Sequence, residues 1–190
     1  MLGRVKTRDL LFLGNTETED RFYYNKYDEH SDRCPGCNRY KADELDLELL
    51  DTDQAIEEAE GRTINEIFAK EGEEAFRSME TDLLDMVVSE HLNGMVVSLG
   101  GGLPLREENR TLLKKAGKIV YLRTQPETVF ERLKGDDTRP LLKTEDPLKR
   151  IKELLSERSD KYETLADIIV DTDGKDASDI AREIIAAIGL

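Results

Sequence analysis

Two clusters of residues in this chain have the side chains that chemistry at a phosphate requires. Asp51-Thr52-Asp53 follows one apolar run, and Gly100-Gly101-Gly102 follows another. A carboxylate can accept the proton of a hydroxyl group, and consecutive glycines let backbone N–H groups approach a ligand without obstruction by a Cβ atom. Arg77, Arg139 and Arg158 add guanidinium groups that match carboxylates and phosphates bidentately. These residue types indicate the acceptor half of a phosphoryl-transfer site.

The loop that would hold a phosphate donor is absent from the sequence. Such loops have the pattern Gly-x-x-x-x-Gly-Lys-Ser/Thr, in which backbone N–H groups and the lysine cradle the phosphates. The chain has two Gly-Lys pairs, Gly117-Lys118 and Gly174-Lys175, and neither is followed by Ser or Thr. Lys26 or Lys41 could replace the missing lysine, but the spacing of neither supports that role.

Composition sets the class of protein. With 190 residues, of which 38% are apolar, the chain is expected to form a single domain over residues 1–190. A net charge of −14 disfavours nucleic acid and anionic membranes as partners. Residues 103–161 carry 15 Lys and Arg against 11 Asp and Glu, which suits a small anionic ligand, although solvated helix faces explain most of these side chains equally well.

No apolar run has the length of a membrane span or the features of a signal peptide, so a cytoplasmic protein is expected. We expect a monomer, with a dimer as the alternative.

Apolar periodicity predicts the elements that must position these residues. Five short strands are predicted at Leu10–Leu13, Leu47–Leu50, Met95–Leu99, Ile119–Leu122 and Ile168–Val170. Helical patterns are found at 64–70, 72–91, 106–116, 126–134, 146–165 and 176–188, the first of them opened by a capping box at Thr63 to Glu66. This alternation predicts an α/β fold, a three-layer sandwich with a five-stranded parallel sheet and helices on both faces. Ligands of such sheets bind beyond the carboxyl ends of the strands, so the aspartates and the glycine triplet are expected at one edge.

A series of motifs runs in a fixed order through residues 47–188. They are Leu-Leu-Asp-Thr-Asp-Gln-Ala-Ile-Glu at 49–57, Ile67-Phe68 with Gly72-Glu73 and Phe76-Arg77, Ser98-Leu99-Gly100-Gly101-Gly102, Arg139-Pro140-Leu141-Leu142, and Arg158 before Tyr162. In this order they resemble the shikimate kinase family. The resemblance implies a P-loop kinase-like fold with a mobile lid, and transfer of the γ-phosphoryl group of ATP to the 3-hydroxyl of shikimate with magnesium present.

The resemblance also implies roles for the acceptor residues. Asp53 would hold the shikimate hydroxyls and help to activate the attacking oxygen, and Asp51 would orient the magnesium shell. Arg77 and Arg158 would bind the shikimate carboxylate. Gly100, Gly101 and Gly102 would offer backbone N–H groups to the substrate.

Two further arginines are assigned to the donor side by the resemblance. Arg139, in the lid, would face the transferred phosphate, and Arg132 would flank the adenine of ATP.

Simpler interpretations remain open for several residues. Arg132 and Arg158 lie on charged helices, where a solvated arginine is the default. The glycine triplet alone could be a flexible turn, and the aspartates alone could be a helix cap in which Asp53 satisfies the first turn.

Residues 15–46 depart from the family pattern and are expected to be an inserted or replaced segment. Glu17, Glu19 and Asp20 stand where the family has glycines, and their carboxylates would repel a triphosphate. Both cysteines of the chain lie in this segment, at Cys34 and Cys37.

The two thiolates, together with His30, could bind zinc, but a closed structural site needs a fourth ligand. That ligand could be Asp32 or a residue of a second chain. Two reduced thiols in a polar loop are the alternative.

Three hypotheses therefore stand. The chain could be an active shikimate kinase whose ATP is held by an unusual loop. It could be a non-catalytic pseudokinase that binds shikimate through the retained half. It could also be an engineered or rearranged variant whose amino-terminal segment, with its Cys-x-x-Cys motif, was exchanged.

Overall fold

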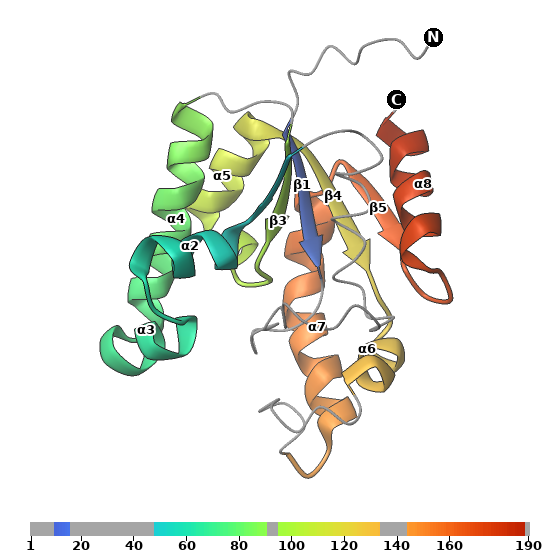
Figure 1. The fold of residues 1–190 in the computed structure, drawn as a ribbon. Coiled ribbons are helices and arrows are strands. Elements are labelled where there is room, and N and C mark those ends of the chain that lie inside the picture. The colour runs from blue at the N-terminus through green and yellow to red at the C-terminus, as the bar shows by residue number, and fades with distance from the viewer. Residues whose placement is uncertain (1–9, 16–47, 91–94, 134–143, 189–190) are drawn as a thin grey trace, which may run out of the picture.

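The strands form one parallel sheet. The computed structural model describes residues 10–15, 48–90, 95–133 and 144–188. The strands are β1 (Leu10–Asn15), β2 (Glu48–Asp51), β3 (Met95–Leu99), β4 (Gly117–Arg123) and β5 (Ile168–Asp171), in the order β2-β3-β1-β4-β5. All four pairings are parallel, so every carboxyl end lies at the same edge (Figure 1). The expected parallel α/β architecture is confirmed.

The helices lie close to the predicted ranges, with one exception. They are α2 (Thr52–Glu60), α3 (Ile64–Glu71), α4 (Glu73–Ser89), the 3₁₀ turn η1 (Leu103–Leu105), α5 (Glu107–Ala116), α6 (Pro126–Leu133), α7 (Pro147–Leu165) and α8 (Ala177–Ile188). The sequence patterns did not predict α2. Ile56, which is buried, is the one large apolar residue among the nine of this helix, so no repeat of large apolar side chains marks the helix in the sequence.

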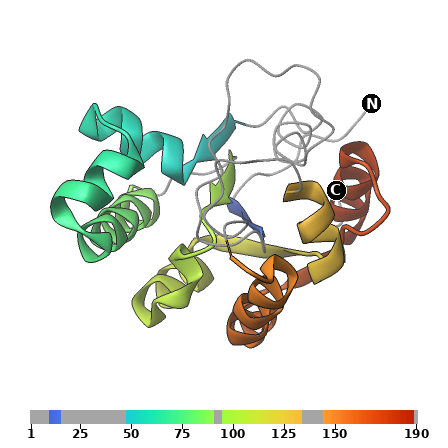
Figure 2. The same cartoon turned by 90° about the horizontal axis from the view of Figure 1, so that it is seen from below.

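Alternate residues of β3 enter two different cores, as the pleat of a strand requires. Val97 and Leu99 belong to a core shared with α4, α5 and α7, through residues such as Leu84, Leu113 and Leu165. Val96 belongs to a second core on the other face, formed with α8 through Ile180 and Ile184. Figure 2 shows α5 and α7 along one side of the sheet and α8 on the other. Helices therefore cover both faces of the sheet.

A smaller cluster beside β2 positions the start of α4. Ile56 of α2, Ile64 and Ile67 of α3, and Phe76 of α4 are buried together. Thr63 and Glu66 form the predicted capping box, with the Thr63 N–H donating to Glu66 Oε2 at 2.8 Å. This packing holds Phe76, and with it the neighbouring Arg77, at the edge of the sheet.

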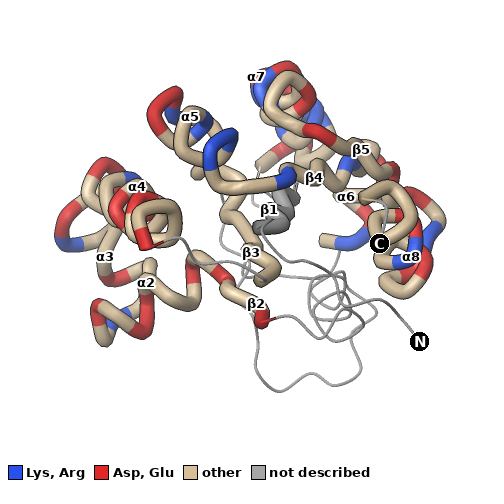
Figure 3. The backbone as a smooth tube through the Cα atoms, turned by 90° about the horizontal axis from the view of Figure 1, so that it is seen from above, with Lys and Arg blue, Asp and Glu red and all other residues tan. Residues whose placement is uncertain are grey.

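Charges of both signs are mixed along α5 and α7, where Figure 3 shows Lys and Arg interspersed with Asp and Glu. The positively charged stretch of the sequence therefore does not present a uniformly basic face on these helices. No helix in the described part of the chain is long and apolar enough to cross a membrane.

Candidate active site

Asp51 and Asp53 have different structural roles. Asp51 ends β2 and caps α2, because its Oδ1 accepts the N–H groups of Asp53 and Gln54, each at 3.1 Å. A helix cap is thus present, as one interpretation of the sequence proposed, but Asp51 provides it instead of Asp53. The side chain of Asp53 is left for another purpose.

Asp53 lies against the first glycine of the triplet. Its Oδ1 is buried and accepts no hydrogen bond from any residue that the structure describes. A Cβ atom on Gly100 would stand 2.8 Å from this oxygen, so only glycine fits there without displacement. The pKa of Asp53 is raised to about 6, mainly by burial and secondly by repulsion from Asp51. The positive charge of Arg77 opposes this shift. The carboxyl group is therefore mostly ionised at neutral pH.

Arg77 lies against the last glycine of the triplet. A Cβ atom on Gly102 would overlap the guanidinium group, so the two residues are in direct contact. Nη1 of Arg77 donates to Glu80 Oε2 and Nη2 donates to Glu73 Oε1, each at 3.0 Å. The two glutamates hold the guanidinium group in a fixed orientation beside the glycine backbone.

Glu80 is a buried member of the site that the sequence did not reveal. It is 1% exposed, and its Oε1 has no hydrogen-bond partner among the residues described. A Cβ atom on Gly100 would lie 3.3 Å from Oε1. Burial raises the pKa of Glu80 to about 7, although Arg77 opposes this shift. The signal available in the sequence was that Glu80 follows Arg77 by three residues, because this spacing places the two side chains on one face of a helix.

The backbone of the glycine triplet is largely engaged. Each carbonyl oxygen accepts one hydrogen bond: Gly100 from the Leu103 N–H (3.1 Å), Gly101 from the Tyr162 hydroxyl (2.5 Å) and Gly102 from the Leu105 N–H (3.0 Å). The N–H of Gly100 donates to Thr52 Oγ1 at 3.3 Å. The N–H groups of Gly101 and Gly102 donate to no other residue in the described ranges. Two backbone donors are therefore available for a ligand.

Arg158 is buried in α7, with 5% of its surface exposed. The interpretation of Arg158 as a solvated side chain on a charged helix is therefore wrong. It lies one turn before Tyr162, whose hydroxyl reaches the triplet. Helices α7 and α4 both pack against η1, which directly follows the triplet. Arg158 and Arg77 thus come from two helices that flank the same loop.

Arg132 lies at the other end of the same sheet edge. It is partly buried, and its Nη2 donates to the carbonyl oxygen of Thr172 at 3.3 Å, just beyond β5. The hydroxyl groups of Thr172 and Thr124 are 2.7 Å apart and join the ends of β5 and β4. Arg132 is therefore anchored to the sheet, away from Asp53 and Arg77 on the β2 and β3 side.

The remaining candidates lie outside the described residues. These are Arg139, and the zinc ligands His30, Cys34 and Cys37. Among the residues that are described, no group of three or more His, Cys, Asp or Glu side chains could hold a metal ion. The predicted zinc site falls outside the described residues and stays a prediction.

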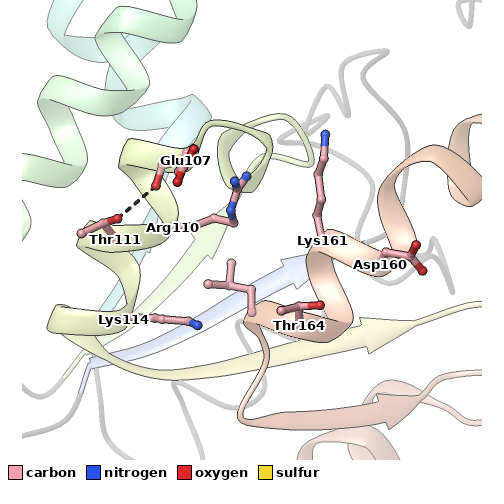
Figure 4. A pocket seen from close by; sticks show the side chains of 8 residues that line it. Glu107, Arg110, Thr111, Lys114, Asp160, Lys161 and Thr164 are labelled. Atoms are coloured by element: carbon pink, nitrogen blue, oxygen red, sulfur yellow. Dashed lines mark hydrogen bonds between the residues drawn. The ribbon is translucent and has the colours of Figure 1, made fainter.

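A groove between α5 and α7 is distinct from the candidate site. Its volume is about 440 Å³, and it is lined by Glu107, Arg110, Thr111, Lys114, Asp160, Lys161, Thr164 and Leu165 (Figure 4). None of the predicted site residues contributes to it, and its lining carries charges of both signs.

Comparison with known proteins shows which family this chain is similar to. The family model of shikimate kinase matches residues 38–189. The shikimate kinase of Thermodesulfovibrio yellowstonii is 42% identical over 144 residues, which are 76% of this chain and 82% of that protein. The shikimate kinase of Neisseria meningitidis serogroup C is 44% identical over 134 residues, which are 70% of this chain and 78% of that protein.

Solved structures give the same result. The shikimate kinase of Acinetobacter baumannii in complex with shikimate superposes with a TM-score of 0.77 at 32% identity, covering 95% of this chain and 92% of that one. The shikimate kinase of Aquifex aeolicus superposes with a TM-score of 0.73 at 29% identity, covering 94% and 95%. The expected P-loop kinase-like fold is thereby confirmed.

Proposed function

This chain belongs to the shikimate kinase family, and from this premise we propose that the sheet edge around Gly100–Gly102 binds shikimate. The reaction of the family is the ATP-dependent phosphorylation of the 3-hydroxyl of shikimate. One observation carries the proposal for this chain. A buried carboxylate, Asp53, and a fixed guanidinium group, Arg77, contact the two ends of one glycine triplet.

The chemistry of shikimate matches these groups. Shikimate is a six-membered ring with one carboxylate and three hydroxyl groups. A ring hydroxyl would donate to Oδ1 of Asp53, which accepts no hydrogen bond from the described residues. The ligand carboxylate would accept from Arg77 and Arg158, for which a planar guanidinium group is well suited. The N–H groups of Gly101 and Gly102 would complete the contacts.

Asp53 also has the protonation state that an acceptor site needs. A phosphoryl-transfer site gains most from positioning and charge neutralisation, while a carboxylate accepts the proton of the attacking hydroxyl. With its pKa raised to about 6, Asp53 is ionised at neutral pH and is still a stronger base than an ordinary aspartate. We therefore assign the role of proton acceptor to Asp53.

The donor side does not match the family. Members of the family use ATP and magnesium, and their phosphate loop follows the first strand. In this chain β1 pairs with β3 and β4, and the residues that come next, 16–20, read Thr-Glu-Thr-Glu-Asp. This segment lacks the glycines and the lysine, and carries negative charge instead. Asp51 remains the candidate contact for the magnesium shell. We propose that binding of ATP is severely weakened.

Calorimetric titration of the protein with shikimate and, separately, with magnesium ATP tests this function. The proposal requires binding of shikimate and little or no binding of ATP. Asp53→Asn should weaken the binding of shikimate, whereas Asp82→Asn, at an exposed site of α4, should leave it unchanged. Binding of both ligands would favour an active enzyme with an unusual ATP loop. Binding of neither would favour the rearranged variant.

A further inference from the structure

Helix α7 presents two different faces. Asp160, Lys161 and Thr164 line the outer groove toward α5 (Figure 4). Arg158 and Tyr162 are buried on another face, with exposures of 5% and 6%. A spacing of four residues places these two side chains one above the other on the helix. The function proposed above uses Arg158 and leaves the buried phenol of Tyr162 without a role.

The Tyr162 side chain is held in place and makes one short contact with the acceptor loop. Its ring packs against that of Tyr121 on β4, with centroids 5.3 Å apart. Its hydroxyl donates to the carbonyl oxygen of Gly101 at 2.5 Å, across 61 residues of sequence. A carbonyl oxygen can only accept, so the phenol must supply the proton of this hydrogen bond.

The contact determines the direction of a neighbouring donor. The carbonyl of Gly101 and the N–H of Gly102 belong to one planar trans peptide unit, in which the two groups point in opposite directions. A peptide unit between two glycines can rotate at little steric cost, because neither residue has a Cβ atom. The Tyr162 hydrogen bond opposes that rotation and keeps the Gly102 N–H directed away from the Tyr162 hydroxyl. The Arg77 guanidinium group lies against the Cα atom of the same residue, Gly102.

We infer that Tyr162 is a positioning residue for the acceptor: its hydroxyl fixes the Gly101–Gly102 peptide unit and so aims the Gly102 N–H at the carboxylate end of the ligand. The inference rests on the proposed binding of shikimate at this loop. Helix α7 then contributes to the site in two ways. It supplies Arg158 to the ligand, and through Tyr162 it orients the Gly102 N–H.

Tyr162→Phe and Tyr121→Phe are a matched pair for the test, since each removes one phenolic oxygen and keeps the contact between the two rings. Tyr162→Phe should weaken shikimate binding by about threefold to tenfold, the range expected for one hydrogen bond. Tyr121→Phe should change it less than about twofold. Thermal unfolding shows whether each variant is folded.

A spectroscopic measurement observes the peptide unit itself. Gly100, Gly101 and Gly102 are the only adjacent glycines in the chain. After labelling of all glycines with carbonyl ¹³C and with ¹⁵N, a carbonyl-filtered amide spectrum therefore retains only Gly101 and Gly102. In ligand-free protein, Tyr162→Phe should move the Gly101 carbonyl and Gly102 amide signals, and Tyr121→Phe should not.

The outcomes separate the two proposals. If wild-type protein does not bind shikimate, the proposed function fails, while the ligand-free spectra still test the hydrogen bond. If wild-type protein binds shikimate, but Tyr162→Phe binds equally well with unmoved glycine signals, the inference on Tyr162 is wrong. If Tyr162→Phe does not fold, the labelled wild type decides, because an unmoved Gly102 amide at saturating shikimate would overturn the inference.

Discussion

The guanidinium group of Arg77 lies so close to the Cα atom of Gly102 that a Cβ atom at Gly102 would overlap Nη1, Cζ and Nη2. The overlapped atoms are the far end of a flexible side chain, so a larger residue would displace Arg77 without breaking the backbone. The contact therefore links a backbone position to the orientation of a side chain that is proposed to bind the ligand.

Gly102→Ala should lower the affinity for shikimate by about tenfold or more, because the displaced guanidinium group can no longer reach the carboxylate. Calorimetry in two backgrounds isolates the cause. In Arg77→Ala protein, Gly102→Ala should lower the affinity for shikimate only slightly further, since the new methyl group has no guanidinium group to displace. Equal losses in both backgrounds would show that Gly102 acts independently of Arg77.

Arg77→Lys should weaken shikimate binding by about 1.5–3 kcal/mol, the range for hydrogen bonds to charged groups, because an ammonium group cannot reproduce the bidentate contact. Arg182→Lys on the exposed face of α8 is the matched control and should have no effect. Unchanged affinity in Arg77→Lys protein would remove Arg77 from the site.

Stability should fall as pH rises from 5 to 8. The pKa of Glu80 is raised from 4.5 to about 7, so within this range the folded state binds more protons than the unfolded state. The free energy of unfolding then declines by at most about 3 kcal/mol through this group. Urea denaturation at several pH values should give a flatter profile for Glu80→Gln. Glu153→Gln, at an exposed position of α7, should retain the wild-type slope. An unaltered slope in Glu80→Gln protein would refute the assignment.

Local patterns in the sequence predicted the elements whose apolar faces are regular. The strand β3 and the helix α3, with its capping box, are examples. The same patterns placed Asp53 and the glycine triplet at one edge, because both follow strands that pair in parallel. Helix α2 was not predicted, since Ile56 is its one large apolar residue and forms no repeat.

Contacts between distant segments could not be predicted. Glu80 looks like any other acidic residue of α4 until Arg77 and Gly100 are seen around it. Arg158 resembles a surface arginine because its neighbours in sequence are charged, while its burial depends on packing of α7. The hydrogen bond from Tyr162 to Gly101 spans 61 residues and leaves no local signal.

A coupled assay of shikimate-dependent ADP release tests the central claim, that the acceptor half is retained and the donor half is not. It is run on the unaltered chain and on a variant with a Gly-x-x-x-x-Gly-Lys-Ser/Thr loop introduced between Gly14 and Lys41. The prediction is negligible turnover for the unaltered chain and recovered turnover for the variant, because Asp53, Arg77 and the glycine triplet are already in place. Robust turnover by the unaltered chain would contradict the account, and would direct the search for phosphate ligands to the basic residues of segment 15–46.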